Sequence, residues 1–291
     1  MDPYAPPVLD LDASEWVSLG VTVTSDEVDQ VAGLLWSVGV AGIEERTNAA
    51  GAVIELVAGV TVGSLSGVLD ALGGRWPVTT ESVTTDEWLD EWRRWAKPWR
   101  AGSRLVVVPS WLAVPSWVGG DEVVVRLDPG RAFGSGAHAT TRLCLAELEA
   151  RVAPGGRVVD VGCGSGVLSV AAALLGAGVV EAIDIDREAV RATEGNVVRN
   201  GVQRVVRSSL IPVEEIAGSA SLVVANIGAA TLVALAESLM AIVEPGGTVV
   251  LSGVLDEQVP AVRTAYEAFG AVWSGGAADG EWRALVLVRS D

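Results

Sequence analysis

The strongest constraint on the fold is the alternation of short apolar runs and helical segments from Gly156 to the end of the chain. Uninterrupted apolar runs such as 157–161 are typical of strands that are buried on both faces. Strands are expected at 157–161, 179–185, 221–227, 248–252 and 282–288, and helices at 167–175, 187–200, 231–243 and 257–269. This order predicts an α/β domain with a doubly wound, parallel sheet that is covered by helices on both faces.

The N-terminal part has a different pattern, because its elements follow one another as β-α-β-β-α-β between residues 16 and 82. That order predicts a small α+β domain of ferredoxin-like type. We therefore expect a first domain at 1–84, a linker helix at 85–100 and a second domain at 101–291.

The linker contains a tryptophan stripe. Trp88, Trp92 and Trp95 share one face of a helix expected at 85–97, which Pro98 ends. This face either packs against a domain or belongs to a stiff arm that positions one domain over the other.

The net charge limits the partners. The chain has 20 basic and 37 acidic side chains, which gives a formal net charge of −17. Such a charge repels phosphate backbones, so we expect no direct nucleic-acid binding. A basic protein would be attracted, although acidity also serves solubility alone.

Cysteine and histidine are scarce. Cys144, Cys163 and a single histidine offer too few soft ligands for zinc, and we predict no metal site. Reduced thiols favour the cytoplasm, and residues 1–12 lack the features of a signal peptide. The uncharged stretch 161–180 is broken by glycines, so we expect a turn and a buried helix rather than a membrane span. We expect a monomer.

The most informative motif is the glycine loop, Asp160–Gly166, which follows a strand and opens a helix. Gly162, Gly164 and Gly166 allow a sharp turn and a close approach of the backbone to a ligand. The dinucleotide fingerprint needs its third glycine where Val167 stands, so a nicotinamide oxidoreductase is disfavoured. A tight turn that binds no ligand is the alternative.

Two aspartates follow the next strand. Asp184 lies 22 residues after Gly162 (184 − 162), where a carboxylate can accept hydrogen bonds from both hydroxyls of a ribose. Asp186 is better placed as the N-cap of the helix at 187–200. Alternatively, both aspartates are caps or solvated turn residues.

An asparagine lies at the end of the strand expected at 221–227. Asn226 precedes Ile227 at the sheet edge where the carboxyl ends of parallel strands meet. Its side chain offers an uncharged carbonyl acceptor to an attacking amine. Capping the following helix is equally compatible with this position.

A second glycine-rich segment, Asp128–Thr141, precedes a helix expected to begin near Arg142. Its glycines predict a flexible loop that can fold over a cofactor. Thr141 is a candidate N-cap or ligand contact. His138 is the only histidine, and it is either structural or a weak candidate for a catalytic base.

Together these segments resemble the ribosomal protein L-eleven methyltransferase family, often called PrmA, among the class I S-adenosylmethionine-dependent methyltransferases. Asp128–Thr141 is similar to that family's signature Asp-Pro-Gly-x-Ala-Phe-Gly-Thr-Gly-x-His-Pro-Thr-Thr, with Ser135 for Thr and Ala139 for Pro. The similarity covers most of the chain and is strongest from 128 to 255. It implies a Rossmann-like methyltransferase sheet of seven strands and an N-terminal domain that recognises the protein substrate.

The resemblance also implies how S-adenosylmethionine is bound. The family's cofactor residues correspond to Thr141, Gly162, Asp184 and Asn226. The other cofactor contacts that we predict lie in the same segments: Phe133, Asp160, Gly164, Gly166 and Ile185. This chain departs from the family at Gly228, where the family usually has Leu.

The activity implied by the resemblance is trimethylation of Lys side chains and of the α-amine of one free large-subunit ribosomal protein. The carbonyls of Asn226 and Ile227 are expected to orient the amine during in-line transfer, and His138 is the one weak candidate base. Gly228 and Ala139 motivate an alternative, a methyltransferase for another protein or a small molecule. A non-catalytic module that only binds the cofactor is a further alternative.

Overall fold

The computed structural model describes residues 16–25, 27–38, 40, 43–47, 54–83, 96–128 and 138–290. It divides into two compact units, Met1–Ala96 and Lys97–Asp291. Residues 84–95, which hold almost all of the predicted linker helix, and residues 129–137, which include Phe133, lie outside the described residues. Within the described part of the chain, no helix is long and apolar enough to cross a membrane.

The N-terminal unit follows the predicted β-α-β-β-α-β order. Its four strands form an antiparallel sheet in the order β2-β3-β1-β4, which confirms the ferredoxin-like arrangement. Leu19 and Leu56 of the sheet pack in one core with Leu35 and Leu72 of the two helices. The elements are β1 (Trp16–Val23), α1 (Val28–Ser37), β2 (Ile43–Thr47), β3 (Ile54–Thr61), α2 (Val62–Leu72) and β4 (Val78–Val83).

The C-terminal unit opens with a small sheet in the order β5-β6-β7. Its strands are β5 (Trp99–Ala101), β6 (Leu105–Pro109) and β7 (Val123–Leu127). Strands β5 and β6 are antiparallel, and β6 and β7 are parallel. Because β7 is the last strand in this order, it is an edge strand of the sheet.

The main sheet of this unit has seven strands in the order β10-β9-β8-β11-β12-β14-β13. The strands are β8 (Arg157–Val161), β9 (Val179–Ile183), β10 (Val206–Ser209), β11 (Ala220–Asn226), β12 (Val243–Leu255), β13 (Ala271–Asp279) and β14 (Trp282–Arg289). The helices are α4 (Ala139–Arg151), α5 (Val167–Leu174), α6 (Arg187–Arg199), α7 (Ala229–Ala234), α8 (Ala236–Ala241) and α9 (Val259–Glu267), with 3₁₀ turns at Val213–Glu215 and Asp256–Gln258. The doubly wound, seven-stranded sheet is therefore confirmed.

The expectation of a wholly parallel sheet is wrong at one end. Strands β10, β9, β8, β11 and β12 are parallel, but β14 runs antiparallel to β12 and β13 runs antiparallel to β14. The reason is the connection between the last two strands. Only Gly280 and Glu281 separate β13 from β14, and so short a turn joins antiparallel strands only.

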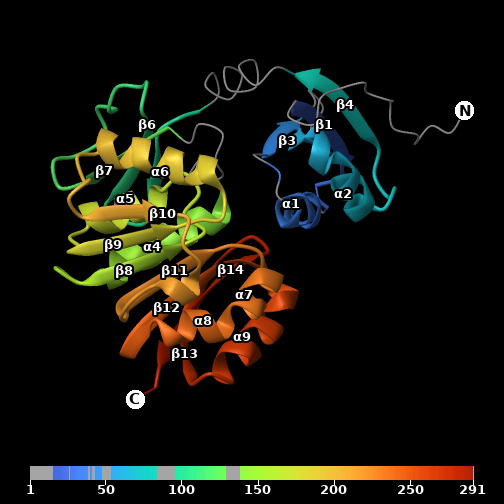
Figure 1. Cartoon of the computed structure of the whole chain (residues 1–291). Helices are drawn as coiled ribbons and strands as arrows, with labels where there is room; N and C mark the ends of the chain where they lie inside the picture. The colour runs from blue at the N-terminus through green and yellow to red at the C-terminus, as the bar shows by residue number, and fades with distance from the viewer. Residues whose placement is uncertain are drawn as a thin grey trace, which may run out of the picture. The chain divides into compact units, whose positions relative to one another are not determined.

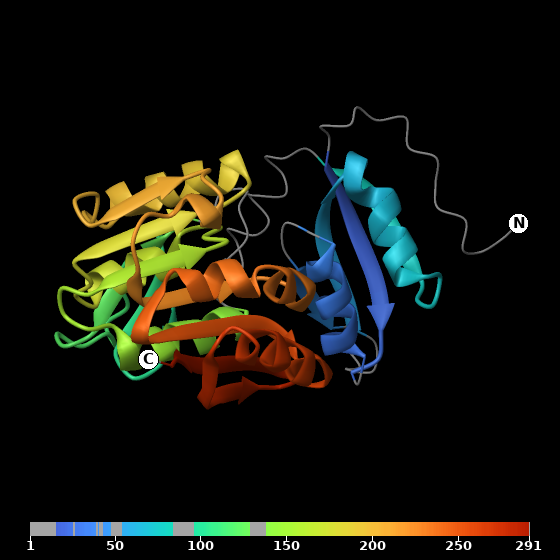
Figure 2. The same cartoon turned by 60° about the horizontal axis from the view of Figure 1, so that its bottom comes forward.

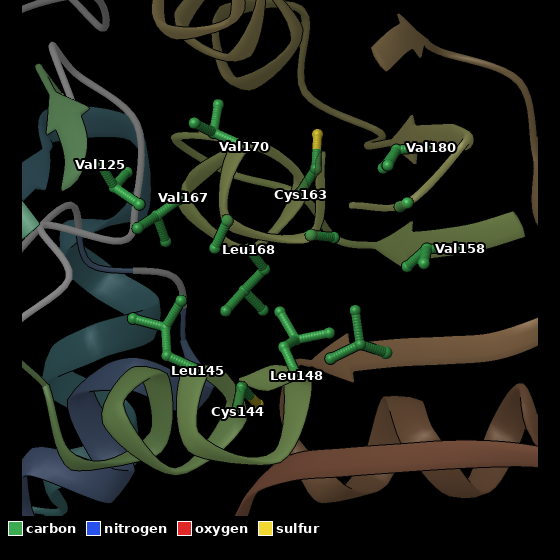
Figure 3. Packing of buried hydrophobic residues seen from close by; sticks show 14 of the residues in the cluster. Val125, Cys144, Leu145, Leu148, Val158, Cys163, Val167, Leu168, Val170 and Val180 are labelled. Atoms are coloured by element: carbon green, nitrogen blue, oxygen red, sulfur yellow. The ribbon is translucent and has the colours of Figure 1, made fainter. Parts of the chain in front are cut away.

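Helices cover both faces of this sheet (Figures 1 and 2). One face packs against α4, α5 and α6 through side chains such as Leu145, Val170 and Val197. The other face packs against α7, α8 and α9. Figure 3 shows the first core from close by, with Leu145 and Leu148 of α4 pointing toward Leu168 and its neighbours. Helices thus pack on both faces of the sheet, and the carboxyl ends of its five parallel strands lie at the same edge.

Candidate active site

The glycine loop at the end of β8 requires glycine for two reasons. Gly162, Gly164 and Gly166 all have left-handed backbone, with φ of 75°, 53° and 77°. A Cβ on Gly162 would lie 2.4 Å from Cγ2 of Ile227, and one on Gly166 would lie 2.7 Å from Oγ1 of Thr193. Gly162 is partly exposed, whereas the other two are buried. Position 162 therefore requires glycine for its left-handed backbone and because a side chain would collide with Ile227, and Gly162 is the partly exposed glycine of the three.

Asp184 is held in place by the backbone at the end of β9. Its Oδ2 accepts a hydrogen bond from the Gly164 amide and its Oδ1 accepts one from the Asp186 amide, each at 2.9 Å. The carboxylate is partly exposed and retains lone pairs for further donors, such as ribose hydroxyls. Asp186 caps α6 by accepting from the Glu188 amide at 2.9 Å, which confirms its predicted structural role.

Apolar side chains lie exposed beside this carboxylate. Ile185 is 98% exposed, and Leu210 and Ile211, which follow the neighbouring strand β10, are 41% and 37% exposed. Apolar side chains left in water at one edge are typical of a surface that binds a ligand. Sequence reasoning missed Leu210 and Ile211, although two consecutive apolar residues after a strand were a readable signal.

Asp160 lies behind the glycine loop and is fully buried. Its Oδ2 accepts a hydrogen bond from Ser169 Oγ at 2.5 Å, while its Oδ1 has no partner among the described residues. Burial, together with the negative charge of Asp184, raises the pKa of this carboxyl to about 7. Asp160 is 0% exposed, so its side chain lies beneath the glycine loop, and its contact with a cofactor stays a prediction.

Thr141 and Asn226 meet although they are 85 positions apart. The Asn226 amide nitrogen donates to Thr141 Oγ1 at 3.4 Å, and both side chains are buried. The alternative that Asn226 caps the next helix is wrong, because Gly228 is the N-cap of α7 and no side chain caps it. The Asn226 carbonyl therefore remains a candidate acceptor at the sheet edge.

The start of α4 differs from the prediction. The helix begins at Ala139 and its N-cap is His138, so the expectation that Thr141 is the N-cap and that the helix starts near Arg142 is wrong. Thr141 sits instead in the first turn, where its hydroxyl can face β11. The hydroxyl of Ser252 donates a hydrogen bond to the carbonyl of Thr140, the residue before Thr141, at 3.3 Å, a contact that the sequence did not indicate.

His138 has a structural environment. Its Nδ1 accepts from the Thr140 amide at 3.4 Å, and its ring meets Trp282 edge-on with centroids 5.1 Å apart. Burial, together with the positive charge of Arg142, lowers the pKa of His138 to about 4. The imidazole is therefore neutral at pH 7 and is a weak base.

Ile227 is wedged between two glycines. A Cβ on Gly253 would lie 2.4 Å from the Ile227 carbonyl oxygen, and a Cβ on Gly162 would lie 2.4 Å from Cγ2 of the Ile227 side chain. Gly228, the next residue, has φ of −62° and ψ of 145°. Nothing lies within 4 Å of a Cβ built there, so neither the backbone nor packing demands glycine at this position.

Helix α6 supplies two polar residues that sequence reasoning missed. Thr193 Oγ1 donates to the Gly164 carbonyl at 3.0 Å, and Asn196 Nδ2 donates to the Ser165 carbonyl at 2.8 Å. Both side chains are fully buried and lie one turn apart on the helix face that is otherwise apolar. Two buried polar residues on such a face were the available signal.

Residues 15–290 match the family model described as ribosomal protein L11 methyltransferase (PrmA). The chain belongs to this family. The predicted resemblance is therefore confirmed, and S-adenosylmethionine is the cofactor of the family.

Individual relatives agree with the PrmA assignment. The ribosomal protein L11 methyltransferase of Pelotomaculum thermopropionicum is 47% identical over 211 residues, which cover 72% of this chain and 67% of the relative. That of Citrifermentans bemidjiense is 46% identical over 67% of this chain and 65% of the relative, so the aligned part spans about two thirds of these proteins. A crystal structure of ribosomal protein L11 methylase from Lactobacillus delbrueckii subsp. bulgaricus superposes with a TM-score of 0.63 at 32% identity, over 67% of this chain and 100% of that one.

The residues at the sheet edge fit this cofactor. The backbone of Gly162 is partly exposed, and Asp184 is a carboxylate held by two backbone amides that can still accept hydrogen bonds. When ionised, the Asp160 carboxyl behind the loop would supply negative charge, which suits a ligand that carries a sulfonium and an ammonium group.

Proposed function

We propose that this protein transfers methyl groups from S-adenosylmethionine to Lys side-chain and α-amino nitrogens of ribosomal protein L11. The family supplies the reaction, and the relatives' names supply the substrate. The observation that carries the proposal is that the predicted site residues touch across three neighbouring strand ends, β9, β8 and β11. These contacts join Asp184 to Gly164, Gly162 to Ile227 and Asn226 to Thr141.

The residues divide into those that hold the cofactor and those that favour its charge. S-adenosylmethionine, when bound, supplies an electrophilic methyl group on a sulfonium. Asp184 and the Gly162 backbone would hold it, and Ile185 would be shielded from water by it. Ionised Asp160 would favour a cationic ligand over a neutral one because it lies unpaired in a low-dielectric interior. Most of the catalysis is then positioning.

The acceptor amine must be neutral to attack. A Lys amine has a pKa of about 10.4, which falls when the amine leaves water. The Asn226 carbonyl would accept a hydrogen bond from the amine and orient its lone pair, whereas the Ile227 carbonyl faces Gly253 and is less accessible. His138, with a pKa of about 4, is poorly matched to receive the proton, so we assign the proton to water.

Charge favours a free basic protein as the substrate. The net charge of −17 repels ribosomal RNA and attracts a Lys-rich protein, so we infer that methylation precedes assembly into the ribosome. We further infer that the protein acts as a monomer in the cytoplasm, where bacterial ribosomes are built.

The intact mass of L11 tests this proposal. Purified L11 incubated with the enzyme and S-adenosylmethionine should gain mass in steps of one methyl group. The Asn226→Ala variant serves as the control and should give little or no gain. Unchanged L11, together with transfer of labelled methyl to another protein of the lysate, would contradict the proposed substrate.

One observation favours a second candidate, a methyltransferase for another protein or a small molecule. A Cβ built on Gly228, two residues after Asn226, would meet no atom within 4 Å, whereas the family usually carries a Leu side chain at this position. A wider acceptor region would admit other amines. Competition between L11 and other lysate proteins for labelled methyl separates the two, since L11 must dominate if the first proposal holds.

A further inference from the structure

Two asparagines, Asn196 of α6 and Asn200 at the C-cap of α6, bind the backbone at β7 as a neighbouring strand would. Asn200 Oδ1 accepts from the Arg126 amide at 2.8 Å, and its Nδ2 donates to the Arg126 carbonyl at 2.7 Å. Asn196 repeats this pattern with Asp128, with distances of 2.9 Å and 2.8 Å. The helix and β7 lie side by side in Figure 1.

The geometry explains why the pattern repeats. Four residues of a helix rise by about 6 Å, and two residues of a strand rise by about 6.6 Å. Amides at positions i and i+4 of α6 therefore match alternate residues of an extended chain. Since β7 is an edge strand, these side chains satisfy backbone groups that no neighbouring strand reaches.

The two asparagines differ in the group that accepts the second hydrogen of their Nδ2 amide. The second Nδ2 hydrogen of Asn200 goes to the Asn196 carbonyl of its own helix, at 2.7 Å. That of Asn196 goes to the Ser165 carbonyl in the glycine loop, at 2.8 Å. Asn196 Oδ1 also accepts from Arg199 Nη1 at 2.7 Å, so this fully buried amide makes four hydrogen bonds and has one possible orientation.

We propose that Asn196 is a positioning residue for cofactor binding. One planar amide joins Asp128, where the signature segment Asp128–Thr141 begins, to Ser165 in the glycine loop. It thereby fixes the glycine loop, which is expected to hold S-adenosylmethionine, relative to the end of β7. This inference rests on the proposed function. Asn200 anchors the same strand without touching the glycine loop, so it provides a matched control.

The test compares Asn196→Ala with Asn200→Ala by calorimetric titration with S-adenosylhomocysteine. Both variants lose the paired bonds to the chain at 126–128, so both should lose similar thermal stability. Asn196→Ala should weaken binding by on the order of tenfold or more, because misplaced binding groups lose affinity steeply, whereas Asn200→Ala should change it by less than about threefold. In turnover, the KM for S-adenosylmethionine should rise while the KM for L11 stays constant, which a general loss of stability would not produce.

A second pair, Asn196→Asp and Asn200→Asp, covers the possibility that the alanine variants unfold. An aspartate at 196 still accepts from the Asp128 amide, and Arg199 neutralises its charge, but it cannot donate to Ser165. Binding should weaken as in Asn196→Ala. A folded Asn196 variant that binds within about threefold of its Asn200 counterpart would overturn the inference. Absence of binding by the unsubstituted protein would overturn the proposed function and this inference with it.

Discussion

Glycines at the amino ends of the strands in the seven-stranded sheet differ in their role from those at the carboxyl ends. Strand β12 has one glycine near each end. Gly246 near the amino edge and Gly253 at the carboxyl edge both have left-handed backbone, with φ of 73° and 85°. Nothing lies within 4 Å of a Cβ built on Gly246, but one on Gly253 would lie 2.4 Å from the Ile227 carbonyl oxygen. The first glycine serves a turn alone, and the second also permits close packing.

Polar residues show the same contrast along β8. Arg157 at the amino end pairs with Glu181 at 2.9 Å, and both side chains remain in contact with water. Asp160, three residues later, is fully buried and has one oxygen without a partner among the described residues. A buried carboxyl with an unpartnered oxygen destabilises the folded state, and this one lies at the sheet edge that carries the site. Such costs in stability are expected at functional sites.

The largest expected effect concerns the pH dependence at Asp160. Its carboxyl binds a proton more tightly in the folded state, with a pKa of about 7, than in the unfolded chain, where the ordinary pKa of an Asp is 3.8. The free energy of unfolding should therefore fall as pH rises from about 4 to 7, by roughly 4 kcal/mol relative to Asp160→Asn, and level off above 7. Urea unfolding across this range checks it. Glu181→Gln, at the other edge, should change stability by no more than about 1 kcal/mol. If the free energy of unfolding changed with pH in the same way in the unsubstituted protein and in Asp160→Asn, the predicted difference between the two edges would be refuted.

The glycine pair gives the next largest effect. Gly253→Ala should lower the free energy of unfolding by about 3 kcal/mol or more, because left-handed backbone and overpacking both oppose a Cβ. Gly246→Ala should lower it by about 1 kcal/mol, from the backbone alone. Chemical denaturation of both variants measures the difference. Equal losses would mean that Gly253 has no special packing role.

Activity separates the two ends of β11. Asn226→Ala should reduce kcat on the order of 100-fold, which is about 2.7 kcal/mol, while the affinity for S-adenosylhomocysteine changes by less than about threefold. Ser221→Ala, near the amino end of the same strand, removes only a hydrogen bond to the Arg157 carbonyl and should leave kcat unchanged. Steady-state kinetics with L11 decide this. Undiminished turnover by Asn226→Ala would remove Asn226 from the mechanism.

The smallest effect on stability is expected at Gly228. Gly228→Leu should change the free energy of unfolding by less than about 0.5 kcal/mol, because its backbone suits any residue and the space is open. If this opening governs acceptor choice, the variant should narrow the set of lysate proteins that are methylated. A loss of more than about 2 kcal/mol would show that the position demands glycine after all.

Sequence reasoning succeeded where a feature depends on neighbouring residues. The order of strands and helices, the glycine loop opening α5 and the Asp186 cap are all local patterns. Spacing along the chain also placed Asp184 beside the glycine loop, because consecutive parallel strands share an edge.

Features set by contacts between distant segments were missed. His138 replaces Thr141 as the N-cap, and Asn196 bonds to Asp128 across 68 positions. The burial of Asp160 depends on packing that no periodicity reveals. These are contacts of three-dimensional packing, so their partners could not be named before the fold was known.

We propose above all that the carboxyl edge of this sheet binds S-adenosylmethionine through Asp184 and the glycine loop. Calorimetric titration of the unsubstituted protein with S-adenosylhomocysteine tests it most directly. We predict binding at one site with micromolar affinity and loss of that binding in Asp184→Ala. No heat and no thermal shift with the unsubstituted, folded protein would contradict the account.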